Sequence, residues 1–300
     1  MLYGKKSALG IAGDVLNITI LSLFTFLCFY PFWYMLIYTL SDESLVARGV
    51  YFIPQGFSLF NIIKVLEMKG IALAFLISVL RTSIGTATAV LGCAFLAYLF
   101  TKREMPMRSF FYRALIITMY VSGGLIPGYL LNRMYGLLNT FWIYIIPGMI
   151  SAYYVLLIKT FIESLPPSLE ESAIIDGAGY GRVFVSIILP LSKPIIATIS
   201  VFAAVGHWNS WFDSHIYISN EKLWTLQYLL YRFLNESQRI AQMLQKDTNI
   251  AAARAAMQQV LTPKGVRMTI TLFVTIPIFL VYPFAQRFFV KGIMIGAIKG

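Results

Sequence analysis

Charged residues are scarce in this chain of 300 residues. Asp, Glu, Lys and Arg together make up 12% of it, against about a quarter in a typical soluble domain. Hydrophobic residues make up 58%, and the mean hydropathy is +0.74. This composition argues against an ordinary soluble domain and predicts a membrane protein.

Cysteine is also rare. Cys28 and Cys93 are the two in the chain, and both lie in apolar runs. They cannot build a disulfide framework, and their spacing fits no metal site. We therefore expect both to be small buried residues.

Catalytic motifs are missing as well. The sequence has no G-x-x-x-x-G-K-[ST] run, so it carries no P-loop for a nucleotide. It has no H-E-x-x-H metal pattern and no nucleophile elbow. The chain is therefore predicted not to be an enzyme and to hold no cofactor or metal of its own.

Long apolar runs are what the sequence does have. A membrane-spanning helix needs about 20 apolar residues, and six segments qualify: 15–40, 82–100, 114–131, 140–158, 195–212 and 268–285. The alternation of an outer-membrane barrel is absent. We predict an all-α polytopic membrane protein, a single domain over 1–300 with six transmembrane helices.

Basic residues in the connections set the expected orientation, because cytoplasmic loops are enriched in Lys and Arg. The short connections on one side hold only Arg48, Lys64, Lys69 and Arg133. The other side, which includes both termini, holds Lys5, Lys6, Lys102, Arg103, Arg108, Arg113, Lys159, Arg182, Lys193, Arg287, Lys291 and Lys299. Both termini are therefore predicted to be cytoplasmic.

Arg81 precedes the second predicted span. A charge at mid-bilayer costs roughly 3 kcal/mol or more, but residues 82–100 are long enough to span alone. We expect Arg81 at the outer edge of the membrane, with its side chain extended to the surface. The alternative is that it lines a polar cavity.

The connection over 163–194 predicts a projecting helical hairpin on the cytoplasmic side. Pro166 and Pro167 stop the fourth span, and Ser168 with Glu171 has the S-x-x-E form of a capping box. Acidic residues are favoured at the positive end of the short helix that should begin there. Leu169, Ala173 and Ile174 fall at helical spacing and form one apolar face.

Three glycines end that short helix. Gly177, Gly179 and Gly181 follow it, and glycine permits the left-handed turn of a helix C-terminus. A second short segment then leads through Pro190 into the fifth span. Such a projection with an acidic tip indicates a cytoplasmic partner.

This connection resembles the EAA loop of ABC importer permeases, whose pattern is E-A-A, three residues, G, nine residues, I-x-L-P. The matching positions are Glu171, Ser172, Ala173, Gly177, Ile187, Leu189 and Pro190. Ser172 in place of alanine is the one departure, a small residue for a small residue. Asp176 before Gly177 resembles the D-G-A variant of sugar importers.

The likeness extends to most of the chain. The cluster Trp208-Asn209-x-Trp211 and the tail from Gly292 to Gly300 are similar to the second permease subunit of maltose-type sugar importers. The run over 282–292 looks like the subgroup that takes up complex or acidic oligosaccharides, including the alginate importer.

The resemblance implies an inner-membrane permease that is paired with a second permease subunit and two copies of a cytoplasmic ATPase, where ATP and Mg bind. An extracytoplasmic binding protein delivers the sugar. The coupling positions implied are Glu171, Ser172, Ala173, Asp176, Gly177, Ile187, Leu189 and Pro190. Nucleic acid is not an expected partner.

The solute path is less defined by the sequence. Aromatic rings stack on sugar rings and polar groups orient hydroxyls, which makes Trp208, Asn209, Trp211 and Tyr217 candidates. The competing interpretation, favoured for the aromatic residues including Trp224, is an aromatic belt at the membrane surface. His207 and His215 are either gate residues or ordinary interfacial residues.

The connection over 213–267 is long enough to contain helices of its own, and residues 250–261 favour one. It carries seven Lys and Arg residues, which fits attraction of an acidic sugar or an acidic partner. The family likeness places it on the outer face.

Two alternatives stay open. A six-span secondary transporter would carry carboxylates within its spans for ion coupling, and the six predicted spans contain no Asp or Glu. A second copy of this chain would satisfy the same physical requirements as a different permease partner.

Overall fold

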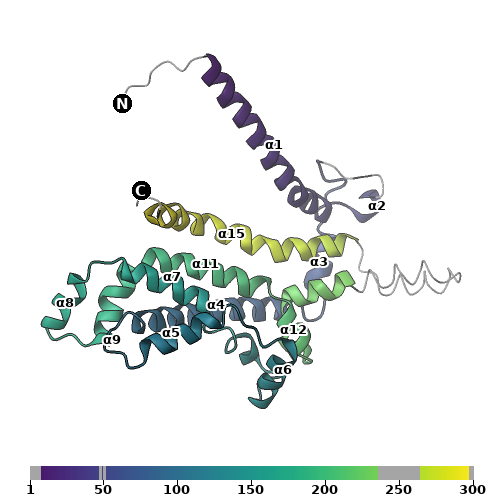
Figure 1. The fold of residues 1–300 in the computed structure, drawn as a ribbon. Coiled ribbons are helices and arrows are strands. Elements are labelled where there is room, and N and C mark those ends of the chain that lie inside the picture. Colours follow the sequence, from purple (N-terminus) through teal and green to yellow (C-terminus); the bar gives the residue numbers. More distant parts are fainter. Residues whose placement is uncertain (1–7, 47–48, 50–51, 236–263, 297–300) are drawn as a thin grey trace. The chain divides into compact units, whose positions relative to one another are not determined.

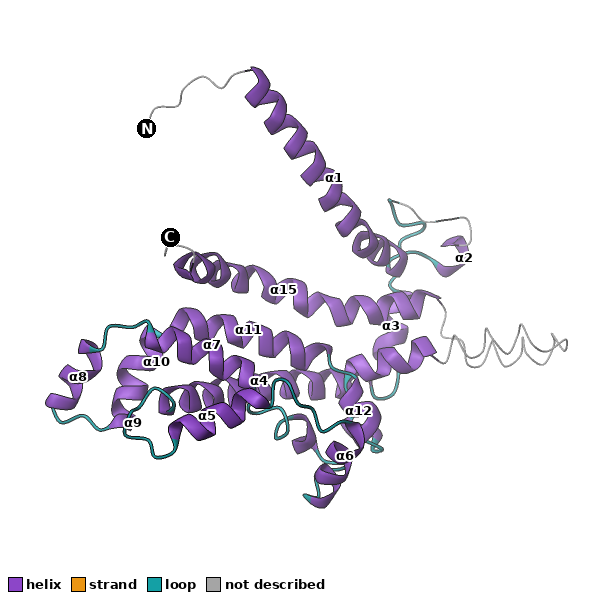
Figure 2. Cartoon of the chain, in the orientation of Figure 1, coloured by secondary structure: helices purple, strands orange, loops and turns teal. Residues whose placement is uncertain are grey.

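The computed structural model describes residues 8–46, 49, 52–235 and 264–296 (Figure 1). Throughout these residues the secondary structure is helical, with no strand beyond an isolated bridge between Ser41 and Phe57 (Figure 2). This confirms the all-α class. The chain forms two compact units, residues 1–68 with 233–275 and residues 69–232 with 276–300.

The first unit is built on the N-terminal apolar run. Its helices are α1 (Ala8–Thr39), α2 (Glu43–Val46), α3 (Phe60–Glu67) and the first part of α15 (Lys264–Gly296). α1 contains most of the predicted span 15–40, and α15 contains all of 268–285. Both apolar runs therefore fold as helices, which satisfy their own backbone hydrogen bonds in lipid.

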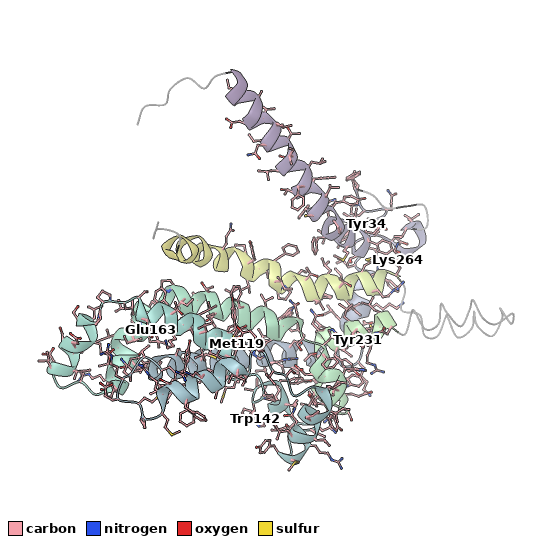
Figure 3. The ribbon with its side chains drawn as sticks, viewed as in Figure 1. Tyr34, Met119, Trp142, Glu163, Tyr231 and Lys264 are labelled. Atoms are coloured by element: carbon pink, nitrogen blue, oxygen red, sulfur yellow. The ribbon has the colours of Figure 1, made fainter. Side chains whose placement is uncertain are left out.

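Polar contacts hold the helices of this unit together. Thr269 Oγ1 donates to Gly265 O at 2.7 Å and lies 3.3 Å from the hydroxyl of Thr39, and both threonines are fully buried. Lys264 Nζ donates to Tyr34 Oη at 3.4 Å (Figure 3). These contacts fix the start of α15 against the end of α1.

The N-terminal part of α1 is exposed along its length. Leu16, Leu23 and Phe24 are each more than 60% exposed, and the apolar window of this helix has no residue buried. Cys28 is exposed here too, so the expectation that it is buried is wrong. In a membrane protein such a surface faces lipid or another subunit.

The second unit contains the remaining helices. In chain order they are α4 (Ile71–Leu99), α5 (Arg108–Ile117), α6 (Leu125–Met134), the 3₁₀ turn η1 (Phe141–Tyr144), α7 (Ala152–Glu163), α8 (Ser168–Ile175), α9 (Tyr180–Val183), the π-helical η2 (Phe184–Ile188), α10 (Leu189–Leu191), α11 (Lys193–Asn209), α12 (Phe212–Tyr217) and η3 (Glu221–Leu223). Residues 226–235 are also helical, and 226–232 of them belong to this unit.

The core of this unit lies where α4 packs against α7 and α11 (Figure 1). The contact face of α4 carries small side chains: Ala89, Cys93, Ala94 and Ala97 are each at most 2% exposed. Small residues let helix backbones approach closely in a membrane, where packing rather than hydrophobicity drives association. The expectation for Cys93 is thus confirmed.

The predicted third span, 114–131, is not one helix. α5 ends at Ile117 and α6 begins at Leu125, with turns and irregular backbone between them. Gly124 has φ +83°, in the left-handed region. A glycine in this conformation directly before Leu125 lets the chain change direction before α6 begins. A count of apolar residues does not reveal such a break in the helix.

The predicted fourth span, 140–158, is also broken. Phe141–Tyr144 forms a 3₁₀ turn and α7 starts only at Ala152. Pro147 and Gly148 lie between them. Proline lacks the N–H that a helix needs and its ring clashes with the preceding turn, so the helix restarts after it, where the Ser151 side chain caps α7.

Two helices of the described residues are long and apolar enough to cross a membrane, Gly10–Thr39 and Ile71–Leu99. The bent pair Tyr180–Leu191 and Lys193–Asn209, which meet at 81°, makes a third if it is counted as one span. Arg267–Pro283 is a shorter apolar helix. The count of six stays a prediction.

Arg81 is not at the edge of a helix. α4 begins ten residues before it, at Ile71, and the Arg81 side chain is 3% exposed. It forms an ion pair with Asp213, donates to Ser210 O at 3.0 Å, and lies 4.5 Å from the centre of the Tyr144 ring. The expectation that the Arg81 side chain extends to the surface is therefore wrong. Its charge is neutralised inside the unit by Asp213.

Asp213→Asn leaves the guanidinium of Arg81 buried without a counter-charge. Breaking a buried ion pair by removing one partner costs about 3 kcal/mol, so we expect a clearly lower unfolding temperature for the purified protein in detergent.

The matched control is Glu221→Gln, which removes an exposed carboxylate and should leave the unfolding temperature unchanged. The double variant Arg81→Met, Asp213→Asn should lose less stability than the single variants sum to. An Asp213→Asn protein as stable as the control would contradict the role of this pair.

Candidate functional site

The segment that resembles an EAA loop begins where α7 ends. Ser164 closes α7, Pro166 and Pro167 follow, and α8 starts at Ser168 as predicted. The predicted capping box does not form, because Pro167 takes the N-cap position and no side chain caps the helix. Instead, the N–H groups of Glu170 and Glu171 donate to Pro167 O at 3.0 and 3.1 Å.

The end of α8 depends on a glycine. Gly177 has φ +82°, the left-handed conformation that the sequence predicts at this position. Its N–H donates to Ile174 O at 3.0 Å, and the N–H of Ala178 donates to Ala173 O at 2.9 Å. This is the Schellman arrangement, which satisfies the last carbonyls of the helix. Asp176 is the C-cap residue.

The side chains of α8 divide between two directions. Ala173 is half-buried and packs against the core of the second unit, as does Ala178. On the other side Leu169 is 42%, Ile174 43% and Ile175 85% exposed. The predicted apolar face is therefore split, because Ala173 turns inward while the larger residues remain exposed.

The polar positions of the motif point outward. Glu171, Ser172, Asp176 and Gly177 are all exposed. A Cβ atom added at Gly177 would meet no atom within 4 Å, so the space beside the turn is open. These four positions form the exposed tip of the loop.

The second half of the motif begins with two half-buried residues that pack against the core. Ile187 and Leu189 pack against the buried cluster around Val183, Phe184 and Ile188. Pro190 stands at the start of α10, next to the 81° bend into α11. Ile187 and Leu189 thus anchor the loop, while Pro190 is exposed.

The candidate solute-path residues lie at the other end of the second unit, with α6 and α12, away from α8 (Figure 1). Figure 3 shows the same separation between Glu163, near the loop, and Tyr231. The candidates contact different neighbours. Trp208 is 7% exposed and meets the edge of Phe75, while Tyr217 stacks on Tyr129 with ring centres 6.0 Å apart.

Trp211 belongs to a separate aromatic cluster. Its ring stacks on Tyr231 at 3.8 Å, and the exposed His215 lies 5.5 Å from the Tyr231 ring. Asn209 accepts a hydrogen bond from Gln227 Nε2 at 3.1 Å. Tyr231 could not be found from the sequence, since it lies outside the motif, whereas its neighbours Trp211 and His215 are sequence candidates.

His207 lies against α4. A Cβ atom added at Gly85 would fall 2.5 Å from His207 Cε1, so the imidazole occupies the space that glycine leaves. This contact gives His207 a packing role between α4 and α11. Trp224 is half-buried, with the Arg232 guanidinium 4.3 Å from its ring centre. The helix predicted over 250–261 lies outside the described residues.

Comparison with known proteins gives relatives along nearly the whole chain. Protein LplC of Bacillus subtilis (strain 168) is 36% identical over 289 residues, which cover 96% of this chain and 95% of LplC. The polygalacturonan/rhamnogalacturonan transport system permease protein YtcP of the same organism is 33% identical, covering 96% and 98%. The lactose transport system permease protein LacG of Rhizobium radiobacter is 27% identical, covering 95% and 96%.

A solved structure agrees with these relatives. The crystal structure of a bacterial ABC transporter involved in the import of the acidic polysaccharide alginate contains a chain with a TM-score of 0.82 and 25% identity, covering 95% of this chain and 99% of that chain. No protein-family model matches the sequence. The relatives and the structure together show that this chain belongs to the permease subunits of ABC sugar transporters.

Proposed function

We propose that this chain is a multi-pass subunit of a bacterial inner-membrane importer and forms part of the translocation path for an oligosaccharide. It pairs with a second permease subunit, docks on cytoplasmic ATPase subunits through α8, and receives its solute from an extracytoplasmic binding protein. The observation that carries the proposal is the exposed face of α8, fixed by the turn at Gly177.

The exposed face of α8 supports docking on a protein partner. A helix of eight residues that leaves Leu169, Ile174 and Ile175 exposed gains stability when those side chains enter a groove. Recognition of a short helix by a groove is a common mode of binding. Glu171 on the same helix offers a carboxylate for a basic group of the partner, and such charged hydrogen bonds are among the strongest.

The need for ATP hydrolysis also supports docking of a separate ATPase on α8. The chain has no P-loop, so a separate subunit must hold ATP and Mg and hydrolyse ATP. Rocking of the permease is then driven through α8. The main competing function is a six-span secondary transporter, which needs carboxylates free for ion coupling. Asp213, the carboxylate next to the end of α11, is engaged by Arg81, which disfavours that function.

The coupling role is tested with Glu171→Ala and Ile175→Glu in the complex with its ATPase and permease partners in liposomes. The first removes the carboxylate and the second puts a charge where an apolar contact is expected. We expect Glu171→Ala to lower binding-protein-stimulated ATP hydrolysis about tenfold, the effect of losing one charged hydrogen bond. Ile175→Glu should lower it as well, because burying an unpaired charge is costly, and both chains should still insert in the membrane.

Glu67→Ala is the matched control, since it removes an exposed carboxylate of α3 and should keep full stimulation. Gly177→Arg extends the test to the turn, because a non-glycine residue at φ +82° is strained. Full stimulation and uptake in Glu171→Ala and Ile175→Glu would remove the main support for the proposal.

For the solute, we propose an acidic oligosaccharide. The structural neighbour imports an acidic polysaccharide, this chain carries a formal charge of +11, and seven of its basic residues lie in 213–267. Basic surfaces raise the local concentration of anionic solutes. The basic residues of the chain lie in connections on both sides of the membrane. Those that bear on the incoming solute are the seven of 213–267, the connection expected on the outer face.

A panel of labelled oligosaccharides tests this. We expect uptake of alginate oligosaccharide to exceed that of lactose, and to fall when ionic strength rises from about 0.01 to 0.15 M, which shortens the screening length from about 30 to 8 Å. Lactose uptake serves as the salt control. Preference for the neutral sugar, or uptake of the acidic one without a salt effect, would contradict the proposal.

A further inference from the structure

α8 makes few apolar contacts with the rest of the permease. None of its residues is fully buried, and among them Ala173 supplies the apolar contact with the core. A helix that is pushed by a partner must nevertheless be fastened to the spans that move. The side chain of α8 that provides this fastening is Glu170.

Glu170 is turned inward, unlike Glu171. Its carboxylate forms an ion pair with Lys102 in which Lys102 Nζ donates to both oxygens. Tyr98 Oη donates to Glu170 Oε1 at 3.1 Å. The Lys102 and Glu170 side chains are only 12% and 20% exposed, so water screens the pair less than it screens a surface ion pair.

Both partners of Glu170 belong to the end of α4. Tyr98 is in the last turn of α4, and Lys102 lies just beyond it, with its Nζ 4.1 Å from the Tyr98 ring centre. Tyr98 is 1% exposed and its ring lies 5.4 Å from that of Phe184 in the core. The partners are thus held by the packed interior of the second unit.

The neighbouring pair Lys159–Glu163 shows the contrast. Lys159 Nζ lies 2.6 Å from Glu163 Oε1, but both residues are on α7, four positions apart. That ion pair joins two turns of one helix, and Lys159 Nζ also lies 4.7 Å from the ring centre of Tyr112 on α5. The pair of Glu170 connects two separate elements that are 68 positions apart in the chain.

We infer that Glu170, Lys102 and Tyr98 form a clamp that fastens the coupling helix α8 to the end of α4, so that a displacement of α8 by the ATPase is passed to α4. This inference rests on the proposed function. Within it, the two adjacent carboxylates have different tasks: Glu171 faces the partner and Glu170 is a positioning residue that faces the permease. α4 then moves the core with it through α7 and α11.

The clamp is tested by the ratio of sugar taken up to ATP hydrolysed, in the full complex in liposomes. Glu170→Gln and Lys102→Met should each lower this ratio about tenfold, the effect expected from losing a charged hydrogen bond. ATP hydrolysis itself should persist, because Glu171 and the exposed face of α8 are intact. The exchange Glu170→Lys with Lys102→Glu should restore most of the ratio.

Lys159→Met is the matched control, since it breaks an ion pair within one helix and should leave the ratio unchanged. A ratio in Glu170→Gln that stays within about twofold of the unmodified complex, well below the effect of a lost charged hydrogen bond, would overturn the clamp.

A second measurement needs no ATPase. In a chain with Cys28 and Cys93 replaced by alanine, Ala173→Cys reports whether α8 is seated on the core. Glu170→Gln should speed the reaction of this cysteine with a maleimide, and Lys159→Met should not. An unchanged reaction rate would show that Glu170 does not hold the helix, whatever happens to transport.

The outcomes separate the clamp from the proposed function. If Glu171→Ala and Ile175→Glu lose stimulated hydrolysis while Glu170→Gln keeps its uptake per ATP, docking stands and the clamp is wrong. If Glu171→Ala and Ile175→Glu keep full stimulated hydrolysis, the proposed function is wrong. The inference that α8 transmits motion to α4 is then wrong as well. The cysteine reaction then still decides whether Glu170 fastens α8.

Discussion

Close packing along α4 is the constraint on which the second unit depends. Lipid gives no hydrophobic force between helices, so they associate through contact area and small side chains. α4 provides these with its row of alanines, with Cys93, and with Gly85 and Gly92, whose missing side chains admit His207 and Ile150. α7 and α11 can therefore lie directly on α4, and the loop between them is held at one end of the resulting core.

Two ion pairs attach neighbouring elements to different parts of α4. One end of α4 carries Tyr98 and leads to Lys102, next to the candidate coupling helix. The other half carries Arg81, whose charge is matched by Asp213 at the start of α12. A 29-residue helix held by one ion pair at Arg81 and by another just past its last residue, at Lys102, resists bending through its backbone hydrogen bonds.

Much of this could be predicted from the sequence. The helical class, the long first helix, the start of α8 at Ser168 and the left-handed Gly177 follow from apolar runs and from local rules for turns. The two breaks in the predicted spans could not be predicted, because a count of apolar residues treats Gly124 and Pro147 as it treats the other residues of a span. The buried position of Arg81 could not be predicted either, because its partner Asp213 lies 132 positions away and no local pattern connects them. The inward turn of Glu170 likewise depends on Lys102, which only the folded chain brings near.

The π-helical turn Phe184–Ile188 has a consequence for how the loop meets the fifth predicted span. A π turn accommodates one residue more than an α-helical turn, which is equivalent to a single-residue insertion in a regular helix. One residue corresponds to a rotation of about 100° around the helix axis. This extra residue therefore sets the sides of the helix on which Leu189 and Pro190 lie, and with them the direction of the bend into α11. A homologue without it would need a different bend to hold the same loop.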